Sequence, residues 1–311
     1  MKKKRNKLAW AGGIVLVVGL IVCLGVGIWT NFDFVRLFQM EPAATGVIEQ
    51  QLDGIDEIVL LGADDIQVRQ VEGDTLRLSY PETEQHSYNL TKEGSSLTLT
   101  EQGAQNWSQF FLFQFSGAQR QATLEIPKDF AGKVTLQGTT GNVNVEDLSG
   151  NIDFTIERTA GDITVGQLQL ERLTLATTTG GDIRLDNAMA EDATLNASTG
   201  HISIGQLEAT ETLQCNATTG DVDGNLLKSR EIAISTSTGD ISLGDIEGEQ
   251  VTLRATSGDI EGTLAGKGGD YTIHSSTDNG DNNLPESLSG GSKTLDVETD
   301  AGDINISFAD A

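Results

Sequence analysis

A row of aspartates at a regular spacing is the part of this sequence best suited to chemistry. Each aspartate follows a glycine, and through the middle of the series these glycines are about twenty residues apart. If the repeats stack in register, the carboxylates form a line, and Ca²⁺ accepts several carboxylate oxygens as ligands. Calcium bridging is therefore the functional hypothesis for five residues: Asp162, Asp182, Asp221, Asp240 and Asp259.

Turn chemistry explains the same residues without a ligand. Glycine adopts positive φ at little cost, and an aspartate side chain forms a local hydrogen bond with nearby backbone. Carboxylates about 4 Å apart repel by roughly 1 kcal/mol in water, and such a hydrogen bond returns about the same amount. Because the spacing also differs from the glycine-rich nonapeptide calcium repeat, we favour the turn interpretation. We expect no cofactor, with Ca²⁺ as the one candidate.

Catalytic motifs do not stand out in the sequence. His86, His201 and His274 have no recognisable partners, and the many serines and threonines lie at turn positions rather than in a nucleophile elbow. Carbohydrate enzymes use β-helices and paired carboxylates, but the repeats lack the aromatic and basic residues of a glycan groove. We therefore expect that the protein is not an enzyme, and a glycan-binding or glycan-active β-helix protein is the alternative.

Two short strands and a bend make up each repeat that positions the aspartates. Around Gly239, apolar residues lie seven and five positions before the glycine, at Ile232 and Ile234, and two and four positions after it, at Ile241 and Leu243. A spacing of two places both side chains of a pair on one face of a strand, and the glycine supplies the corner.

Such a unit cannot bury its inner face alone, so neighbouring repeats must stack. The sequence thus predicts an all-β fold, a single-stack, β-helix-like β-solenoid with about 20 residues per coil over residues 133–311. In this arrangement Cys215 is in register with Leu195 and Ile234, as a small buried hydrophobe.

Open ends are the weak point of a solenoid, because the last coil exposes unpaired backbone groups. Residues 47–132 contain short alternating runs typical of β-strands, and we expect this segment to cap one end. At the other end, either Phe308 closes the stack or the edge pairs with another molecule. Self-association through the solenoid ends is therefore one of the predicted interactions.

An aromatic segment interrupts the strands of the capping region. The favoured interpretation is an aromatic strand or hairpin packed over the open end. The functional hypothesis is an exposed tip that touches the bilayer or a partner, since contiguous exposed apolar surface usually marks an interaction site. The residues concerned are Trp107, Phe110, Phe111, Phe113 and Phe115.

The N-terminus has the pattern of a membrane anchor. A basic cluster is followed by an uncharged stretch from Leu8 to Phe32, with Trp10 and Trp29 near its ends. This pattern predicts a cytoplasmic stub and transmembrane helix over 1–30, with the N-terminus inside, and a juxtamembrane linker over 31–46. The chain is then a single-pass protein of the cytoplasmic membrane with an extracytoplasmic C-terminal domain. A cleaved signal peptide is the alternative.

The strong negative charge limits the partners. A formal net charge of -26 excludes nucleic acid, since phosphate binding requires a basic face. Contact with an envelope protein or a wall polymer is compatible with this charge.

The order of these features resembles a known family. The anchor is followed by strands that lead to Leu124-Glu125-Ile126-Pro127, and then by repeats such as Thr-Thr-Gly-Asn-Val and Ser-Thr-Gly-Asp-Ile. This combination is similar to the LiaG-like family of bacterial envelope proteins, over about 47–311. The extracytoplasmic domain of that family is known as a "putative adhesin" of unknown function. The resemblance implies a membrane-anchored surface protein and supplies no catalytic residues.

Together, these features predict a membrane-anchored extracytoplasmic β-solenoid that acts as an adhesin or cell-envelope interaction scaffold. The alternative is an envelope-stress accessory protein that contacts a membrane signalling partner.

Overall fold

The computed structural model describes residues 44–83, 86–103 and 121–309. From Thr45 onward, these residues belong to one compact unit. The predicted transmembrane helix and the aromatic segment from Trp107 to Phe115 lie outside the described residues, as does nearly all of the linker. Within the described ranges, no helix is long and apolar enough to cross a membrane.

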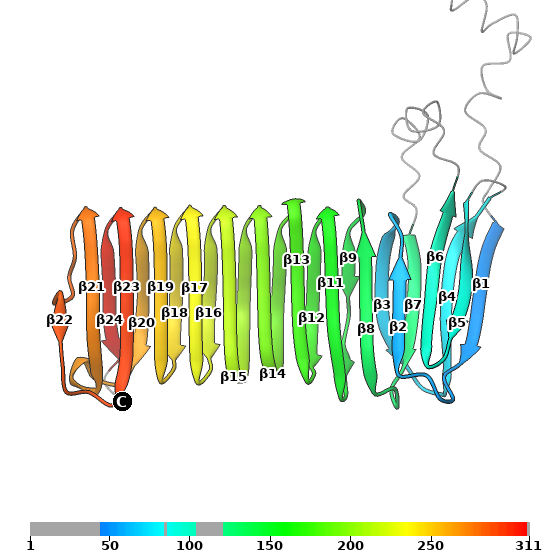
Figure 1. The fold of residues 1–311 in the computed structure, drawn as a ribbon, viewed down its shortest axis with the longest axis horizontal. Helices are drawn as coiled ribbons and strands as arrows, with labels where there is room; N and C mark the ends of the chain where they lie inside the picture. The colour runs from blue at the N-terminus through cyan, green and yellow to red at the C-terminus, as the bar shows by residue number, and fades with distance from the viewer. Residues whose placement is uncertain (1–43, 84–85, 104–120, 310–311) are drawn as a thin grey trace, which may run out of the picture. The chain divides into compact units, whose positions relative to one another are not determined.

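Parallel strands stack side by side along the described unit and form its two faces (Figure 1). We call the strand that precedes each glycine corner the upstream strand and the strand that follows it the downstream strand. The upstream strands are β8 (Gly132–Gly138), β11 (Ile152–Ala160), β13 (Arg172–Gly180), β17 (Glu231–Thr238), β19 (Gln250–Ser257), β21 (Tyr271–Asn279) and β23 (Lys293–Ala301). The downstream strands are β9 (Val143–Val145), β12 (Ile163–Gln169), β16 (Val222–Lys228), β18 (Ile241–Glu247), β20 (Ile260–Ala265) and β24 (Ile304–Ala309).

Two long strands, β14 (Ile183–Thr199) and β15 (Ile202–Thr219), run through a downstream position into the upstream position of the next coil. The two-residue strand β10 (Leu148–Ser149) pairs with the end of β12. The prediction of an all-β solenoid is therefore confirmed for the described residues, where the only helical element is the short 3-10 helix η1 (Gly268–Asp270).

The core is a stack of apolar columns, as the repeat pattern predicts. Leu195 pairs with Cys215, and Cys215 pairs with Ile234, so equivalent residues are about 20 positions apart. All three side chains are buried, and burial raises the pKa of the Cys215 thiol to about 12. The prediction that Cys215 is an in-register core residue is confirmed.

The first coil of the stack comes from the segment expected to be a cap. β2 (Glu57–Leu61) pairs in parallel with β8, and β3 (Asp65–Val71) pairs with β9. On their other side lie β6 (Ser96–Gly103) and β7 (Gln121–Pro127). The predicted boundary at residue 132 therefore runs through one continuous hydrogen-bonded stack. The remaining strands of this end are β1 (Ala44–Gln51), β4 (Thr75–Glu82), which is antiparallel to β7, and β5 (His86–Glu93), which is antiparallel to β6.

The last two upstream strands, β21 and β23, stack in the opposite order to their order in the sequence. β23 lies between β19 and β21, so the chain reaches the outermost position at β21 and then returns to fill the position before it. The short strand β22 (Ser287–Leu288) pairs antiparallel with the outer edge of β21. Phe308 packs against Tyr271 at this end, with ring centroids 5.7 Å apart.

Candidate functional site

The predicted aspartates form a continuous ladder of hydrogen bonds from coil to coil. Oδ1 of Asp162 accepts the backbone N–H of Asp182 at 2.9 Å, and Oδ1 of Asp182 accepts the N–H of His201 at 2.8 Å. Nδ1 of His201 accepts the N–H of Asp221 at 3.2 Å. The same contact joins Asp65 to Asn142, Asn142 to Asp162, Asp221 to Asp240, Asp240 to Asp259, Asp259 to Asp303, and Asp303 to Asp281. We call this series the Asx ladder.

The Asx ladder gives each aspartate a structural role that needs no ion. One carboxylate oxygen satisfies a backbone donor of the next coil, 19 or 20 residues away, rather than the local backbone group expected from turn chemistry. The five predicted aspartates are brought into one row, but no three ladder residues meet as a metal-ligand group among the described residues. Calcium binding by Asp162, Asp182, Asp221, Asp240 and Asp259 stays a prediction.

Close contact between successive corners explains the glycines of the repeat. Gly200 has φ of 146°, and a Cβ atom there would lie 2.2 Å from the carbonyl oxygen of Gly181. A side chain at this position would therefore require both a disfavoured backbone conformation and separation of the two coils.

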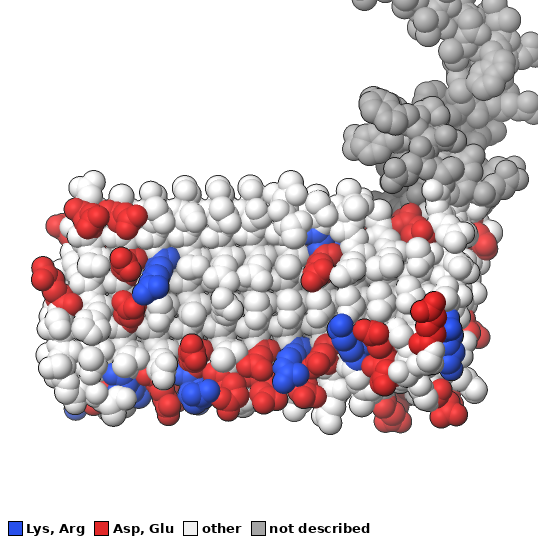
Figure 2. Space-filling model, in the orientation of Figure 1, with Lys and Arg blue, Asp and Glu red and all other residues white. Residues whose placement is uncertain are grey.

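The upstream face carries an uncharged surface in the middle of the stack. Figure 2 shows many of the charged residues along the lower edge and others toward the two ends, with a largely white area in the middle. Asn216 donates a hydrogen bond to Asn196 at 2.9 Å, and Ser235 donates to Asn216 at 2.8 Å. Glu157 and Arg254 are the charged residues that bound this region in the same columns. We call it the neutral face; its residues are Thr174, Ala176, Thr194, Asn196, Gln214, Asn216, Ala233 and Ser235.

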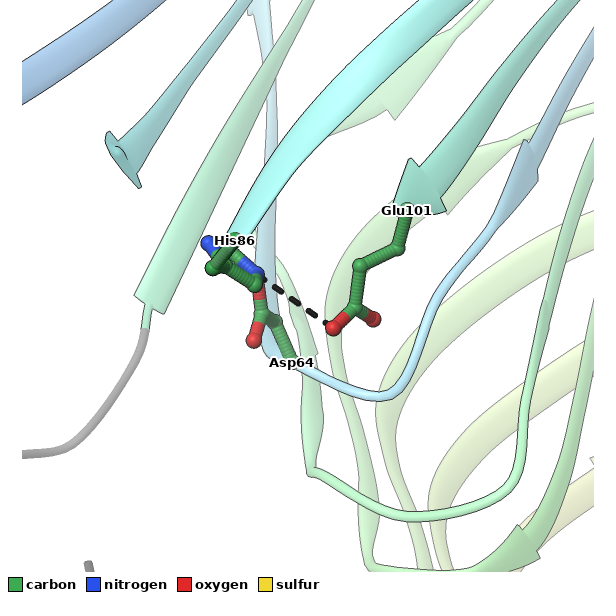
Figure 3. Close-up of side chains that lie close together, drawn as sticks. All are labelled: Asp64, His86 and Glu101. Carbon is green, nitrogen blue, oxygen red and sulfur yellow. Dashed lines mark ion pairs between the residues drawn. The ribbon is translucent and has the colours of Figure 1, made fainter. Parts of the chain in front are cut away.

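A buried polar cluster at the first coil was not expected from the sequence. His86 comes from β5, Glu101 from β6 and Asp64 from the corner before β3, and the three side chains converge (Figure 3). His86 Nε2 lies 2.9 Å from Asp64 Oδ2 and 3.3 Å from Glu101 Oε1. His86 and Asp64 are only 2% and 4% exposed. The expectation that His86 lacks partners is therefore wrong, because non-repeating strands bring its partners to it.

Hydrogen bonds hold each member of this cluster in place. His86 Nδ1 lies 2.7 Å from the carbonyl oxygen of Pro81, so Nδ1–H donates to that oxygen and Nε2 faces the two carboxylates. Tyr88 donates its hydroxyl to Asp64 Oδ2 at 3.1 Å, and the backbone N–H of Ala63 donates to Glu101. Hydrogen bonding to Asp64 and then to Glu101 raises the pKa of His86 to about 10, against the opposing effect of burial.

A buried arginine on β11, two coils along the stack from β2, reaches back toward this cluster. Arg158 is 1% exposed, and its Nη1 donates to the carbonyl oxygen of Gly62 at 2.8 Å. Burial lowers the pKa of Arg158, while Tyr88, Asp65, Asp64 and Glu101 act in the opposite direction. The cluster therefore belongs to a larger set of buried ionisable groups at the first coils.

The stacked parallel coils and their glycine–aspartate corners define a single-stack β-solenoid. The chain belongs to the Toastrack DUF4097 family, whose model matches residues 55–307. The finer resemblance to the LiaG-like family stays a prediction.

Several solved structures are similar to this chain. A "putative adhesin" from Bacteroides fragilis has 13% sequence identity, with 86% of this chain and 99% of that chain covered and a TM-score of 0.49. A "putative cell adhesion protein" from Clostridium sporogenes has 12% identity, with 86% and 100% covered and a TM-score of 0.30. A "putative adhesin" from Parabacteroides merdae has 13% identity, with 85% and 96% covered and a TM-score of 0.32. The search of curated proteins found no match.

Proposed function

We propose that this protein is a surface interaction scaffold of the adhesin type, held at the cytoplasmic membrane by residues 1–30 and displaying its solenoid outside the cell. The neutral face carries the proposal. In a chain with a formal net charge of -26, four neighbouring strands present two columns of neutral side chains, all polar except Ala176 and Ala233.

The chemistry of the neutral face favours binding over catalysis. Its strands are fixed by parallel pairing, and Asn196, Asn216 and Ser235 are joined by hydrogen bonds, so little side-chain entropy is lost when a partner docks. At about 4.8 Å between strands, the four strands extend over roughly 15 Å. A regular surface of this kind suits an extended or repetitive partner of the envelope, such as a wall polymer or a second surface protein.

The neutral face also lacks the negative charge that would repel anionic partners. The acidic lower edge repels the anionic polymers and proteins common at a bacterial surface, whereas the neutral face does not. Charge introduced into this face should therefore weaken binding without loss of the fold. The alternative function, an envelope-stress accessory that contacts a membrane signalling protein, uses the same face with a different partner.

Site-specific photo-crosslinking of the full chain in intact cells tests the proposal. A crosslinking amino acid replaces Thr194 on the neutral face, and the matched control replaces Ser203, which is similarly half-buried on the downstream face. We expect adducts from the Thr194 position and few from the Ser203 position. Wall polymer in the adducts supports the adhesin role, and a membrane protein supports the accessory role.

A charge variant makes the same test quantitative. Thr194→Arg should reduce crosslinking from a probe at Thr174 at least tenfold, while Ser203→Arg should leave it unchanged. Equal adduct yields from the two faces, or equal effects of the two arginine variants, would contradict the proposal.

A further inference from the structure

The orientation of His86 creates a position next to two carboxylates where a cation would be stabilised. Nδ1–H is committed to the carbonyl oxygen of Pro81, so the lone pair of a neutral imidazole points from Nε2 toward Asp64 and Glu101. Three electron-rich atoms facing one another in a buried site repel unless a cation lies among them. A proton on Nε2 or a metal ion bound by all three residues can supply this charge.

Nε2 of His86 lies among oxygen atoms that can share a cation with it. His86 is only 2% exposed, and its Nε2 approaches the two carboxylates with poor alignment for an N–H donor. Its distances of 2.9 Å to Asp64 and 3.3 Å to Glu101 also fit the separation of neighbouring ligands around one ion. Tetrahedral zinc has bonds of about 2.0–2.2 Å, which places neighbouring ligand atoms roughly 3.3 Å apart.

We propose that Asp64, His86 and Glu101 bind one divalent transition-metal ion, with Zn²⁺ as the best fit. Each residue offers one ligand atom, and these three atoms all lie within 4.8 Å of one another. One imidazole and two carboxylates form a mixed nitrogen and oxygen ligand set, which suits zinc better than calcium or magnesium. The two carboxylates also balance the charge of the ion.

The second layer of contacts matches a metal centre. Metal-binding histidines commonly donate their other N–H to a backbone carbonyl or a carboxylate, as His86 does to Pro81. The ligating carboxylates are themselves oriented by hydrogen bonds, from Tyr88 to Asp64 and from Ala63 to Glu101. These contacts fix all three ligands before an ion arrives, so binding requires little rearrangement.

The position of the site indicates a structural role for the ion. Asp64 belongs to the corner of the first coil, whereas His86 and Glu101 belong to the antiparallel strands β5 and β6 at the end of the stack. A bound ion would join this end to the first coil across segments that are distant in sequence. We expect zinc to raise the thermal stability of the protein and to close the end of the stack against local opening.

Zinc binding by the full chain in detergent is the direct test. After treatment with a chelator, the protein is titrated with Zn²⁺ by calorimetry, and its unfolding temperature is measured with and without the ion. We expect binding of one zinc ion per chain and a higher unfolding temperature. The Co²⁺ form should show the intense visible absorption of a tetrahedral site.

Matched variants distinguish this site from the rest of the chain. His86→Gln and Glu101→Gln should each weaken zinc binding at least 100-fold and abolish the Co²⁺ spectrum. His201→Gln, which changes an exposed histidine of the Asx ladder, should leave both unchanged. Circular dichroism of each variant checks that it folds, and Glu101→Gln keeps a side-chain oxygen for the hydrogen bond from Ala63.

Two results would overturn the proposal. One is a wild-type chain that binds no zinc at micromolar concentration and whose unfolding temperature does not respond to it. The other is binding that persists in folded His86→Gln or Glu101→Gln protein. Either result would assign the cation position to a proton and the cluster to a buried charge network.

Discussion

The side chain of Asn283 forms two hydrogen bonds with the backbone of Ile306. Oδ1 accepts the N–H at 3.0 Å and Nδ2 donates to the carbonyl oxygen at 2.9 Å. Two residues earlier in β24, the carbonyl oxygen of Ile304 accepts the N–H of Asn283, and the N–H of Ile304 donates to the carbonyl oxygen of Asp281. The segment 281–283 therefore occupies the edge of β24 where another strand would otherwise pair.

The first prediction concerns this covered edge. Asn283→Leu removes both bonds to Ile306, which lowers the free energy of unfolding by about 2 kcal/mol and leaves two backbone groups of β24 unpaired. We expect concentration-dependent association of the variant in light scattering, since open strand edges recruit further strands. Asn225→Leu, at an exposed asparagine of β16 in the middle of the stack, is the control. A variant that stays monomeric at all concentrations would show that this edge does not drive self-association.

The second prediction separates the two roles of the Asx ladder. Asp240→Asn keeps an Oδ1 atom that can accept the N–H of Asp259, whereas Asp240→Ala removes it. If the ladder is structural, the Ala variant loses about 1 kcal/mol in urea unfolding and the Asn variant loses little. Equal losses in both variants would mean that the charge of Asp240, rather than its hydrogen bond, stabilises the fold.

The calcium prediction is tested on the same proteins. Ions bridging the ladder would raise the unfolding temperature of the wild type in Ca²⁺ and lower it again with chelator. The rise should be smaller in Asp240→Asn, which has one charge fewer in the row. If neither calcium nor chelator changes the unfolding temperature, the ladder does not bind calcium and its role is structural alone.

The third prediction concerns the close approach of the corners. Gly200→Ala places a Cβ 2.2 Å from the carbonyl oxygen of Gly181, so we expect a loss of roughly 3 kcal/mol or more in the free energy of unfolding. Gly73 also has a positive φ, of 117°, but no atom lies within 4 Å of its Cβ position. Gly73→Ala should therefore lose only about 1 kcal/mol. Similar losses of stability in Gly200→Ala and Gly73→Ala would show that close contact between coils is not the reason for the glycine in each repeat.

The fourth prediction follows from the buried thiol. The pKa of Cys215 is about 12 in the folded protein and about 8.5 in an unfolded chain. The stability that depends on the protonated thiol is therefore fully present below about pH 8.5 and is lost as the pH rises toward 12. Cys215→Ala is less stable at neutral pH because of the cavity, but the gap to the wild type should narrow by about 1.4 kcal/mol per pH unit above 8.5.

Denaturant unfolding at several pH values measures this gap. In a Cys23→Ser background, a thiol reagent should also label Cys215 only at the rate of unfolding. Fast labelling of the folded protein would show that the core column is open at this residue.

The repeated part of the fold was predictable because its rules are local. Inward residues two positions apart, such as Ile232 and Ile234, and a glycine at each corner determine the coil wherever it lies in the stack. Register then follows from burial, since a slip of one residue would turn Cys215 and its neighbours out of the core. The acidic row was found for the same reason, although its hydrogen bonds to the next coil could only be seen once the coils were stacked.

What the sequence determined by itself is therefore the period, the inward columns, the corners and the row of aspartates, because each depends on residues within one repeat or at the same place in the next. Only the tertiary structure decided which coil follows which at the C-terminal end, where β23 lies inside β21, because equivalent strands offer nearly equal pairing partners. It also decided the meeting of Asp64, His86 and Glu101. Those residues come from strands outside the repeat, and burial and side-chain direction, rather than any spacing, bring their atoms together.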